Sequence, residues 1–328
     1  MDSDYSIIAT GLRKRFGPTL ALDGFDLRVK AGTVHGLLGP NGAGKSTAVR
    51  ILTTLTRLEA GTATVAGIDV AADPAGVRAR VGLVGQSAAV DEILGGEQNL
   101  VMFGRLFGLN TRAAKTRAAE LLHRFDLTEA AGKAVGGYSG GMRRRLDIAA
   151  SLILSPAVLY LDEPTTGLDP RGRNEVWNAV RQASGAGTTV LLTTQYLEEA
   201  DQLADEVSVM KTGKVIAEGT PDNLKRDLAD DVVSVVVSDS GRLAEAAELL
   251  ARVSGAGASV DSDARTASTR TARGTATLVE AIRALDGAGI EIDDVSLRRP
   301  TLDEVFLTLT ETDTDSDTDS TDDTEETR

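Results

Sequence analysis

The chain opens with short runs of apolar residues separated by glycine-containing turns, a pattern that predicts β-strands. Two such runs lie at residues 6–9 and 25–29. The run Val34–Leu38 is mostly apolar and leads into a glycine-rich loop, and residues 45–55 then carry apolar side chains at helical spacing. Strand, glycine loop and helix in this order are the setting in which a loop binds phosphate.

The pattern becomes mostly helical between residues 97 and 154. Thr111 is expected to cap a helix that runs to Phe125, because alanines and leucines recur after it at helical intervals. Two strands of the buried type follow at 158–161 and 189–192, with a helix at 172–184 between them. This order predicts a parallel β-α-β unit.

The last third of the chain differs in composition. A hairpin is expected at 206–218, and the elements after it are expected to be a strand at 232–237, a helix at 243–253, weak β-strands, a helix near 277–286 and a strand near 290–297. Their order is close to the β-α-β-β-α-β pattern of ferredoxin-like domains. The sequence therefore predicts an α/β domain at 1–228, a small C-terminal α+β domain at 229–310 and a tail at 311–328.

Charge is concentrated in this tail. The chain has a net charge of −14, and residues 311–328 contribute nine acidic residues and one arginine. Such a segment has little to bury, so we expect it to be disordered. An acidic chain is not attracted nonspecifically to nucleic acid or to anionic lipid.

Two further features of the composition limit the function. The absence of cysteine excludes disulfides and thiolate metal sites. No apolar run approaches the roughly 20 residues that span a bilayer. If the protein works at a membrane, we therefore expect another chain to supply the span.

The glycine-rich loop fits the Walker A pattern in full, with Gly39, Pro40, Asn41, Gly42, Ala43, Gly44, Lys45, Ser46 and Thr47. Its glycines let backbone N–H groups turn toward a phosphate, and the following helix N-terminus adds positive potential. The pattern predicts that Lys45 reaches the β- and γ-phosphates of ATP and that Ser46 ligates Mg²⁺. The alternative, a chance glycine turn, is disfavoured by the strand before it and the helix after it.

An apolar strand at 158–161 ends in two carboxylates, Asp162 and Glu163. We expect Asp162 to hold Mg²⁺, directly or through water. Glu163 would then polarise the water that attacks the phosphate. Paired acids at a strand end are often a solvated turn, but a Walker A loop in the same chain favours the catalytic interpretation.

A second possible anion site lies between these motifs, at Ser139-Gly140-Gly141. Ser-Gly-Gly at the start of a helix offers a hydroxyl and bare backbone to a phosphate. The three arginines at 143–145 that follow are interpreted as a solvated face, without a role in nucleic-acid binding. Neither His35 nor His123 has a partner at metal-ligand spacing, so no metal role is expected for either.

These motifs, together with Gln86 and Gly167-Leu168-Asp169, resemble ABC-type ATPase cassettes in order and spacing over about residues 5–225. The resemblance implies a P-loop ATPase fold with a helical signature subdomain. It also implies a homodimer that clasps two ATP molecules, with Mg²⁺, between its two cassettes.

The resemblance assigns roles by position. Gln86 resembles the Q-loop residue that touches Mg²⁺ and the attacking water, and its loop is implied to couple to a membrane subunit. Residues Ser139–Gly141 would contact the γ-phosphate bound by the opposite protomer, and Asp169 resembles the acid that links the two sites. Phe16 stands where the family has an aromatic residue that stacks on adenine, and the equally open alternative is a plain core aromatic.

The end of the chain narrows the family. The segment 300–307, Pro-Thr-Leu-Asp-Glu-Val-Phe-Leu, resembles the ending of daunorubicin-resistance-type ATPases, although it is also compatible with a plain amphipathic helix. Those proteins resemble drug and lipid efflux ATPases that pair with a separate membrane permease. The resemblance implies export rather than import, at the cytoplasmic face of the cell membrane.

The sequence departs from the family pattern at three positions. Tyr138 and Met142 replace the usual leucine and glutamine of the signature, while its Ser-Gly-Gly centre is intact. Gln195 stands where cassettes usually have a switch histidine. Its neutral amide can donate a hydrogen bond to the γ-phosphate but carries no charge, so slow hydrolysis is expected.

Two other functions compete with an exporter ATPase. A soluble cassette protein that acts on ribosomes or DNA is disfavoured by the single cassette, the lack of long insertions and the acidic charge. A nucleotide-binding regulator without turnover is suggested by Gln195 alone, and the expected base Glu163 argues against it.

Overall fold

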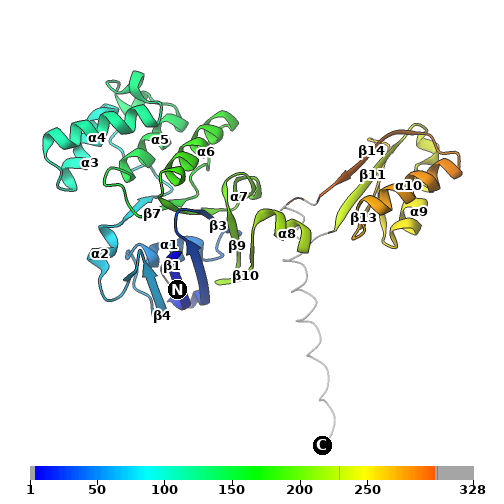
Figure 1. Cartoon of the computed structure of the whole chain (residues 1–328), viewed down its shortest axis with the longest axis horizontal. Coiled ribbons are helices and arrows are strands. Elements are labelled where there is room, and N and C mark those ends of the chain that lie inside the picture. The colour runs from blue at the N-terminus through cyan, green and yellow to red at the C-terminus, as the bar shows by residue number, and fades with distance from the viewer. Residues whose placement is uncertain (1–3, 229, 300, 302–328) are drawn as a thin grey trace, which may run out of the picture. The chain divides into compact units, whose positions relative to one another are not determined.

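The computed structural model describes residues 4–228, 230–299 and 301. The chain divides into two compact units, Met1–Thr220 and Pro221–Arg328, each described here by itself (Figure 1). The domain boundary expected at 228/229 lies at the end of α8 (Pro221–Leu228), whereas the two units divide before that helix. The acidic tail and all of the 300–307 motif except Thr301 lie outside the described residues. Among the described helices, none is both long and apolar enough to cross a membrane.

A six-stranded sheet forms the centre of the first unit, in the order β10-β9-β3-β8-β7-β6. Its strands are β3 (Val34–Leu38), β6 (Val81–Val84), β7 (Val158–Asp162), β8 (Thr189–Thr194), β9 (Glu206–Lys211) and β10 (Lys214–Gly219). The β9–β10 pair is antiparallel and the other pairs are parallel. The predicted hairpin and the predicted β-α-β unit around α6 (Pro170–Gly185) are therefore confirmed.

A second, antiparallel sheet in the order β2-β1-β4-β5 belongs to the same unit. It contains β1 (Tyr5–Phe16), β2 (Thr19–Lys30), β4 (Ala60–Val65) and β5 (Ile68–Asp69). The first two strands are longer than the apolar runs that predicted them. Their pairing continues through polar residues with several bulges, which interrupt the period-two pattern in the sequence.

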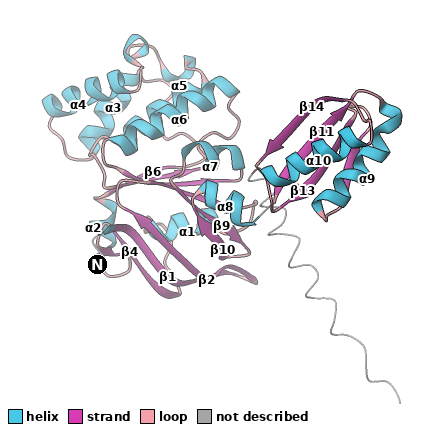
Figure 2. Ribbon diagram, turned by 45° about the vertical axis from the view of Figure 1, so that its right-hand side comes forward, coloured by secondary structure: helices cyan, strands magenta, loops and turns pink. Residues whose placement is uncertain are grey.

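The helices of this unit fall into two groups (Figure 2). A helical region with α3 (Gly96–Leu106), α4 (Thr111–Arg124), α5 (Gly140–Ser151) and α6 lies on one side of the six-stranded sheet. Helix α7 (Leu197–Leu203) contacts α6 and β3 and contributes Leu203 to the same core, whereas α1 (Lys45–Leu52) and α2 (Pro74–Arg78) pack with the antiparallel sheet. Short 3₁₀ turns lie at Thr128–Ala130 and Val135–Gly137. The predicted cap of α4 was wrong by one residue, since Asn110 accepts the hydrogen bond from the N–H of Ala113, at 2.9 Å.

Alternate residues of the central strands belong to two different cores. On β7, Leu159 and Leu161 pack with the helical region, whereas Val158 and Tyr160 pack with α1 and the antiparallel sheet. All four side chains are fully buried. A strand buried on both faces reads as a continuous apolar run, which is why the sequence predicted it.

The second unit contains a four-stranded antiparallel sheet in the order β12-β13-β11-β14. Its elements are β11 (Asp231–Val237), a 3₁₀ turn at Ser240–Arg242, α9 (Leu243–Ser254), β12 (Ala258–Asp261), β13 (Thr266–Thr271), α10 (Thr275–Gly287) and β14 (Ile292–Arg298). This chain order and strand order confirm the predicted ferredoxin-like fold. Val233, Val235 and Val237 form a core with α9 and α10, and the intervening residues of β11 point to the other face of the sheet.

Candidate active site

The predicted catalytic residues gather at one edge of the six-stranded sheet. Strands β3, β8, β7 and β6 are neighbours and run parallel, so their carboxyl ends lie at the same edge. The Walker A loop at residues 39–47, called the P-loop below, follows β3. Gln195 follows β8, Glu163 follows β7, and Gln86 follows β6 by two residues. The carboxyl ends of parallel strands are where α/β proteins bind ligands.

The P-loop backbone needs its glycines. Gly44, the N-cap of α1, has φ of 105°, and a Cβ there would lie 2.4 Å from a backbone oxygen of β2. Gly42 also has a positive φ, 83°. L-residues rarely adopt such angles, so both positions favour glycine.

Lys45 is folded into this loop. It is only 4% exposed, and its Nζ donates hydrogen bonds to the carbonyl oxygens of Gly39, at 2.8 Å, and Pro40, at 3.1 Å. The same Nζ lies 3.6 Å from Oε1 of Glu163. Burial lowers the pKa of Lys45, against the opposing effects of Glu163 and Asp162.

Asp162 accepts hydrogen bonds from two hydroxyl groups. Ser46 donates to its Oδ1 at 3.2 Å and Thr193 donates to the same oxygen at 2.5 Å. The β7–β8 register places Asp162 directly opposite Thr193. Sequence reasoning missed Thr193, because its proximity to Asp162 follows only from this strand pairing.

The backbone at Glu163 is in the left-handed region, with φ of 47°. Its N–H is held by the carbonyl and hydroxyl oxygens of Thr193, at 3.1 and 3.2 Å. A non-glycine residue in this region is strained and is typically found where function fixes a side chain. The turn directs the Glu163 carboxylate toward Lys45.

The loop that contains Gln86 is anchored on both sides by α5. Arg144 donates to the carbonyl of Gly85 at 2.6 Å, and Asp147 accepts from the N–H of Ala89 at 3.0 Å. Gln86 itself is exposed. A more distant hydrogen bond, 3.3 Å long, joins Arg144 to the carbonyl of Asp162.

The interpretation of residues 143–145 as a solvated face was wrong for two of the three arginines. Arg144 and Arg145 are 5% and 9% exposed. Arg145 donates to the carbonyl of Phe125 at 2.7 Å and to Glu175 at 3.1 Å. The prediction was wrong because a run of like charges ordinarily indicates side chains that are exposed to solvent, whereas these two side chains are buried by the packing of α5.

The signature residues Ser139–Gly141 make hydrogen bonds and contacts within the helical region. Ser139 caps α5, and its Oγ accepts from the N–H of Met142 at 3.2 Å. Ser139 and Gly140 are exposed, and Gly141 is buried against Gly172 of α6. In the described part of the chain, no hydrogen bond joins Ser139–Gly141 to the P-loop.

Gln195 and Asp169 lie at element ends. Gln195 directly follows β8 and is half-buried, one residue beyond Thr194, whose carbonyl accepts from the N–H of Gly39 at 3.2 Å. Asp169 caps α6 by accepting from the N–H of Gly172 at 2.9 Å. Asp169 therefore has a structural contact in addition to the role that the family resemblance implies.

Phe16 is not a core residue. It lies at the end of β1 with 50% exposure, and the Nζ of Lys14 is 5.3 Å from its ring centroid. The alternative that placed it in the core is therefore wrong. An exposed ring is free to stack on a planar ligand.

One histidine lies near two carboxylates after all. A ring nitrogen of His35 and oxygens of Glu206 and Glu218 lie within 4.8 Å of one another. The ring is fully buried and its Nε2 is hydrogen-bonded to Ser208 at 2.8 Å. Lys30 pairs with Glu206 at 2.5 Å, so the charge of this carboxylate is already balanced.

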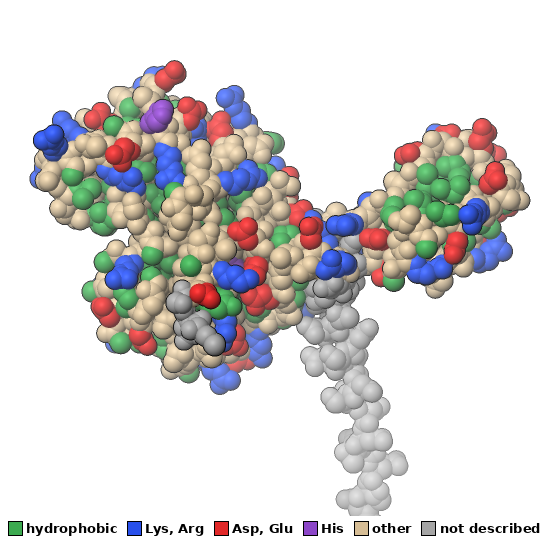
Figure 3. All heavy atoms as spheres, viewed as in Figure 1, with side chains coloured by type: hydrophobic (Ala, Val, Ile, Leu, Met, Phe, Trp, Pro, Cys, Tyr) green, Lys and Arg blue, Asp and Glu red, His purple; other side chains and the backbone are tan. Residues whose placement is uncertain are grey.

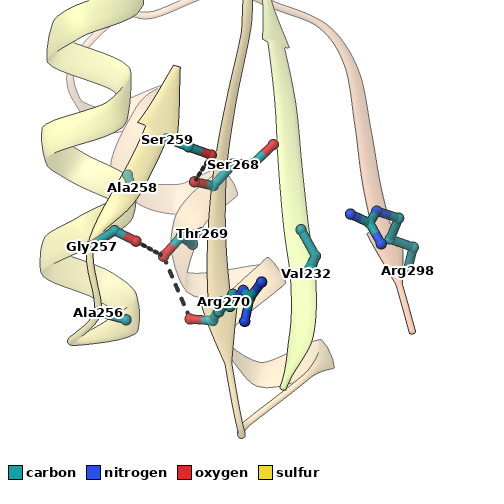
Figure 4. A pocket seen from close by; sticks show the side chains of 9 residues that line it. All are labelled: Val232, Ala256, Gly257, Ala258, Ser259, Ser268, Thr269, Arg270 and Arg298. Atoms are coloured by element: carbon teal, nitrogen blue, oxygen red, sulfur yellow. Dashed lines mark hydrogen bonds between the residues drawn. The ribbon is translucent and has the colours of Figure 1, made fainter. Parts of the chain in front are cut away.

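A separate hollow of about 530 Å³ lies in the second unit (Figure 4). It is lined by strand residues that include Arg270, Arg298 and Ser268. Part of its wall is held by the bond from Thr269 Oγ1 to the carbonyl of Gly257, at 3.0 Å. None of the predicted catalytic residues lines it, so the chemistry is assigned to the edge of the six-stranded sheet.

Comparison with known proteins shows the family of the chain. The family described as ABC transporter matches residues 22–166, and the C-terminal domain of ATP-binding protein DrrA1-3-like matches residues 219–310. Daunorubicin resistance ATP-binding protein DrrA2 of Streptomyces coeruleorubidus is 58% identical over 93% of this chain and 95% of its own length. Doxorubicin resistance ATP-binding protein DrrA of Mycobacterium tuberculosis is 49% identical over 94% of this chain and 95% of its own length.

Solved structures agree on the fold. The cbiO1 protein of Clostridium perfringens, part of the ABC transporter complex cbiONQ, is 28% identical with a TM-score of 0.63. That match covers 67% of this chain and 90% of the other. The chain belongs to the ATP-hydrolysing, ATP-binding subunits of ABC transporters, in the family of the daunorubicin resistance ATP-binding proteins.

Proposed function

We propose that this chain is the motor of a drug exporter, in which two copies close on two ATP molecules and drive a separate permease. The observation that carries the proposal is the group formed by Lys45, Ser46, Asp162, Glu163 and Thr193 at one sheet edge. The named relatives are resistance proteins for daunorubicin and doxorubicin. A drug related to daunorubicin and doxorubicin is therefore the substrate class that we propose.

The residues present fit Mg²⁺. Ser46 and Asp162 offer a hydroxyl and a carboxylate, which are the hard oxygen ligands that this ion prefers, and they already lie 3.2 Å apart. Gln86 would complete the set from the neighbouring strand end. The ion would neutralise charge on the β- and γ-phosphates. Thr193 would keep the Asp162 carboxylate oriented toward Ser46.

Lys45 and Glu163 are proposed to exchange partners when ATP binds. A γ-phosphate that bound the Lys45 ammonium would break the 3.6 Å contact between Lys45 and Glu163. Glu163 would then be available to accept a proton from the attacking water. Gln195, at the adjacent strand end, would donate a hydrogen bond to the γ-phosphate without adding a charge, so turnover is slow but real.

The dimer is proposed because one chain holds its two phosphate-binding motifs apart. Ser139–Gly141 make no hydrogen bond to the P-loop in the described residues, and Ser139 and Gly140 face solvent. A second copy would bring its own Ser139 to this P-loop, and the arrangement would be reciprocal. Asp169 would lie next to the same junction, after the Glu163 turn.

The test is ATP turnover by the wild type and by Glu163→Gln, with the oligomeric state followed by light scattering. Wild-type hydrolysis that is lost in Glu163→Gln, together with an ATP-dependent dimer of that variant, supports the proposal. Glu120→Gln, which changes an exposed glutamate of α4, is the matched control and should retain turnover. Equal turnover in the wild type and Glu163→Gln contradicts the assignment of the base.

The permease is proposed to dock beside Gln86. An apolar hollow of about 230 Å³ is lined by Leu83 and Ala89, which flank Gln86 in the sequence, and by Phe103 and Phe107. The rings of Phe103 and Phe107 stack with centroids 6.4 Å apart, and Phe107 is 53% exposed. Docking at this hollow would place the chain at the cytoplasmic face of the membrane and would let permease movement reach Gln86.

Because the chain has no cysteine, a single one makes a unique cross-linking site. Phe107→Cys should cross-link to the exporter's membrane subunit in membranes that contain both proteins. Glu129→Cys, which is exposed in a 3₁₀ turn, is the control and should not. Equal cross-linking at both positions would place the docking surface elsewhere.

A nucleic-acid partner is not proposed. On the face shown in Figure 3, Lys and Arg side chains are interspersed with Asp and Glu and form no continuous basic area among the described residues. Affinity for nucleic acid rests on such areas.

The C-terminal unit is proposed to be an accessory domain of the motor.

A further inference from the structure

A buried carboxyl group lies behind the active site, and no predicted role accounts for it. Glu199, on α7, is 1% exposed, and neither of its carboxyl oxygens has a hydrogen-bond partner among the described residues. Buried polar atoms without partners are few in native proteins and each needs an explanation. An ordinary helix residue at this position would be apolar.

The groups that face Glu199 are themselves unusual. They are the hydroxyls of Thr165 and Thr194 and the indole of Trp177, with the guanidinium of Arg144 farther away. Thr165 Oγ1 and Trp177 Nε1 are also buried without a hydrogen bond in the described structure. Four buried polar atoms without a hydrogen-bond partner among the described residues, two of Glu199 and one each of Thr165 and Trp177, therefore belong to side chains that face one another in the interior.

Three of these neighbours are adjacent in sequence, or hydrogen-bonded, to a loop of the proposed active site. Thr165 lies two residues after Glu163, in the turn that continues to Asp169. Thr194 immediately precedes Gln195. Arg144 donates to the carbonyl of Gly85, next to Gln86, at 2.6 Å.

We infer that Glu199 is a positioning residue, whose carboxyl holds the Glu163–Asp169 turn and the Gln195 strand end at a fixed separation from behind. It touches neither ATP nor water, and acts through Thr165 and Thr194. The inference rests on the proposed roles of Glu163 and Gln195. Glu163, as the base, and Gln195, as the hydrogen-bond donor to the γ-phosphate, would act on the same phosphate. Their separation must therefore be correct, because a small misplacement lowers kcat strongly.

The chemistry of the carboxyl suits this role. Burial raises the pKa of Glu199, which favours the neutral acid. A neutral carboxyl group both donates and accepts hydrogen bonds, as an amide does. It can therefore accept from the Trp177 indole and exchange hydrogen bonds with the two threonine hydroxyls, without an unpaired buried charge.

The experiment compares Glu199→Gln with Glu199→Leu, and measures thermal unfolding together with kcat and KM for ATP. Glutamine keeps a donor and an acceptor of the same shape, so kcat should stay within about twofold of the wild type. Leucine fills the space without polar atoms, so kcat should fall about tenfold while KM changes less than about twofold. Glu198→Leu, at the exposed neighbouring position on α7, is the matched control and should retain kcat.

A folded Glu199→Leu protein with wild-type kcat would overturn the inference, and so would a Glu199→Gln protein that loses as much kcat as the leucine variant. If Glu199→Leu does not fold, Thr165→Val makes the same test, since valine replaces the hydroxyl in a site only 2% exposed. Thr165→Val should then lower kcat with KM unchanged, and wild-type kcat would refute the idea. Glu163→Gln in the same series separates this outcome from failure of the proposed ATPase site.

Discussion

Acid should destabilise the first unit through a single histidine. His35 lies in β3 immediately before the P-loop, is fully buried, and shares its Nε2 with the hydroxyl of Ser208 at 2.8 Å. Its Nδ1 has no hydrogen bond in the described structure. Burial lowers the pKa of His35 from 6.5 to about 4, although Glu206 raises it and Lys30 lowers it further.

The sign of the effect follows from the direction of this shift. The folded protein keeps His35 neutral down to about pH 4, whereas the unfolded chain takes up the proton near pH 6.5. Between these values the unfolded state binds more protons, so the free energy of unfolding falls as the pH falls. The whole shift corresponds to about 3 kcal/mol, of which about 1 kcal/mol is lost between pH 7 and pH 5.5.

The assay is urea unfolding at pH 7 and pH 5.5, followed by the fluorescence of Trp177. This is the one tryptophan of the chain, and it lies buried in the same unit. His35→Gln, whose amide can still bond to Ser208, should lose about 1 kcal/mol less than the wild type over this interval. His123→Gln, at the exposed histidine of α4, should leave the pH dependence unchanged. If His35→Gln and the wild type lost the same free energy, the desolvation argument would be refuted.

Three other sets of substitutions test the site. Gln195→His should raise kcat about fivefold, because a charged donor strengthens a hydrogen bond by about 1 kcal/mol, and Gln195→Ala should lower it. If neither changed kcat, Gln195 would have no catalytic role. Phe16→Ala should raise the Kd for ATP about tenfold, because stacking on adenine is lost, whereas Leu20→Ala on the same ribbon should leave the Kd unchanged. Equal effects of the two variants in a fluorescent-ATP titration would show that Phe16 does not contact adenine. Gly44→Ala should abolish ATP binding, whereas Gly42→Ala, which has open space around its Cβ, should cost about 1–2 kcal/mol and still bind ATP; binding by both would contradict the P-loop geometry.

Much of the catalytic edge could be predicted from the sequence because its residues follow strands that are buried on both faces. Such strands appear as short apolar runs, and the residue after each run is placed at the sheet edge. The P-loop and the Asp162-Glu163 pair were found in this way. The long antiparallel strands β1 and β2 were underestimated, because bulges and polar residues break their alternation.

Contacts that depend on strand register or on burial of charge were not visible in the sequence. Thr193 became a partner of Asp162 only through the β7–β8 register. Arg144 and Arg145 form a run of positive charge in the sequence, and only the packed helix shows that both are buried, with partners that include the backbone carbonyls of Gly85 and Phe125. Glu199 was hidden for the same reason, because a glutamate in an acidic helix ordinarily faces solvent.

Helix α5 links the two halves of the proposed mechanism within one rigid element. Its N-cap, Ser139, is the group that we propose contacts the ATP of a second copy, whereas Arg144 and Asp147, farther along it, hold the backbone on both sides of Gln86. Both of these charged side chains are buried. A shift of Ser139 on dimer closure would therefore displace the Gln86 loop of the same chain, beside the hollow proposed for the permease. In this proposed arrangement the closing of one site and the movement of the membrane subunit would need no separate connection, because both would act on the same twelve-residue helix.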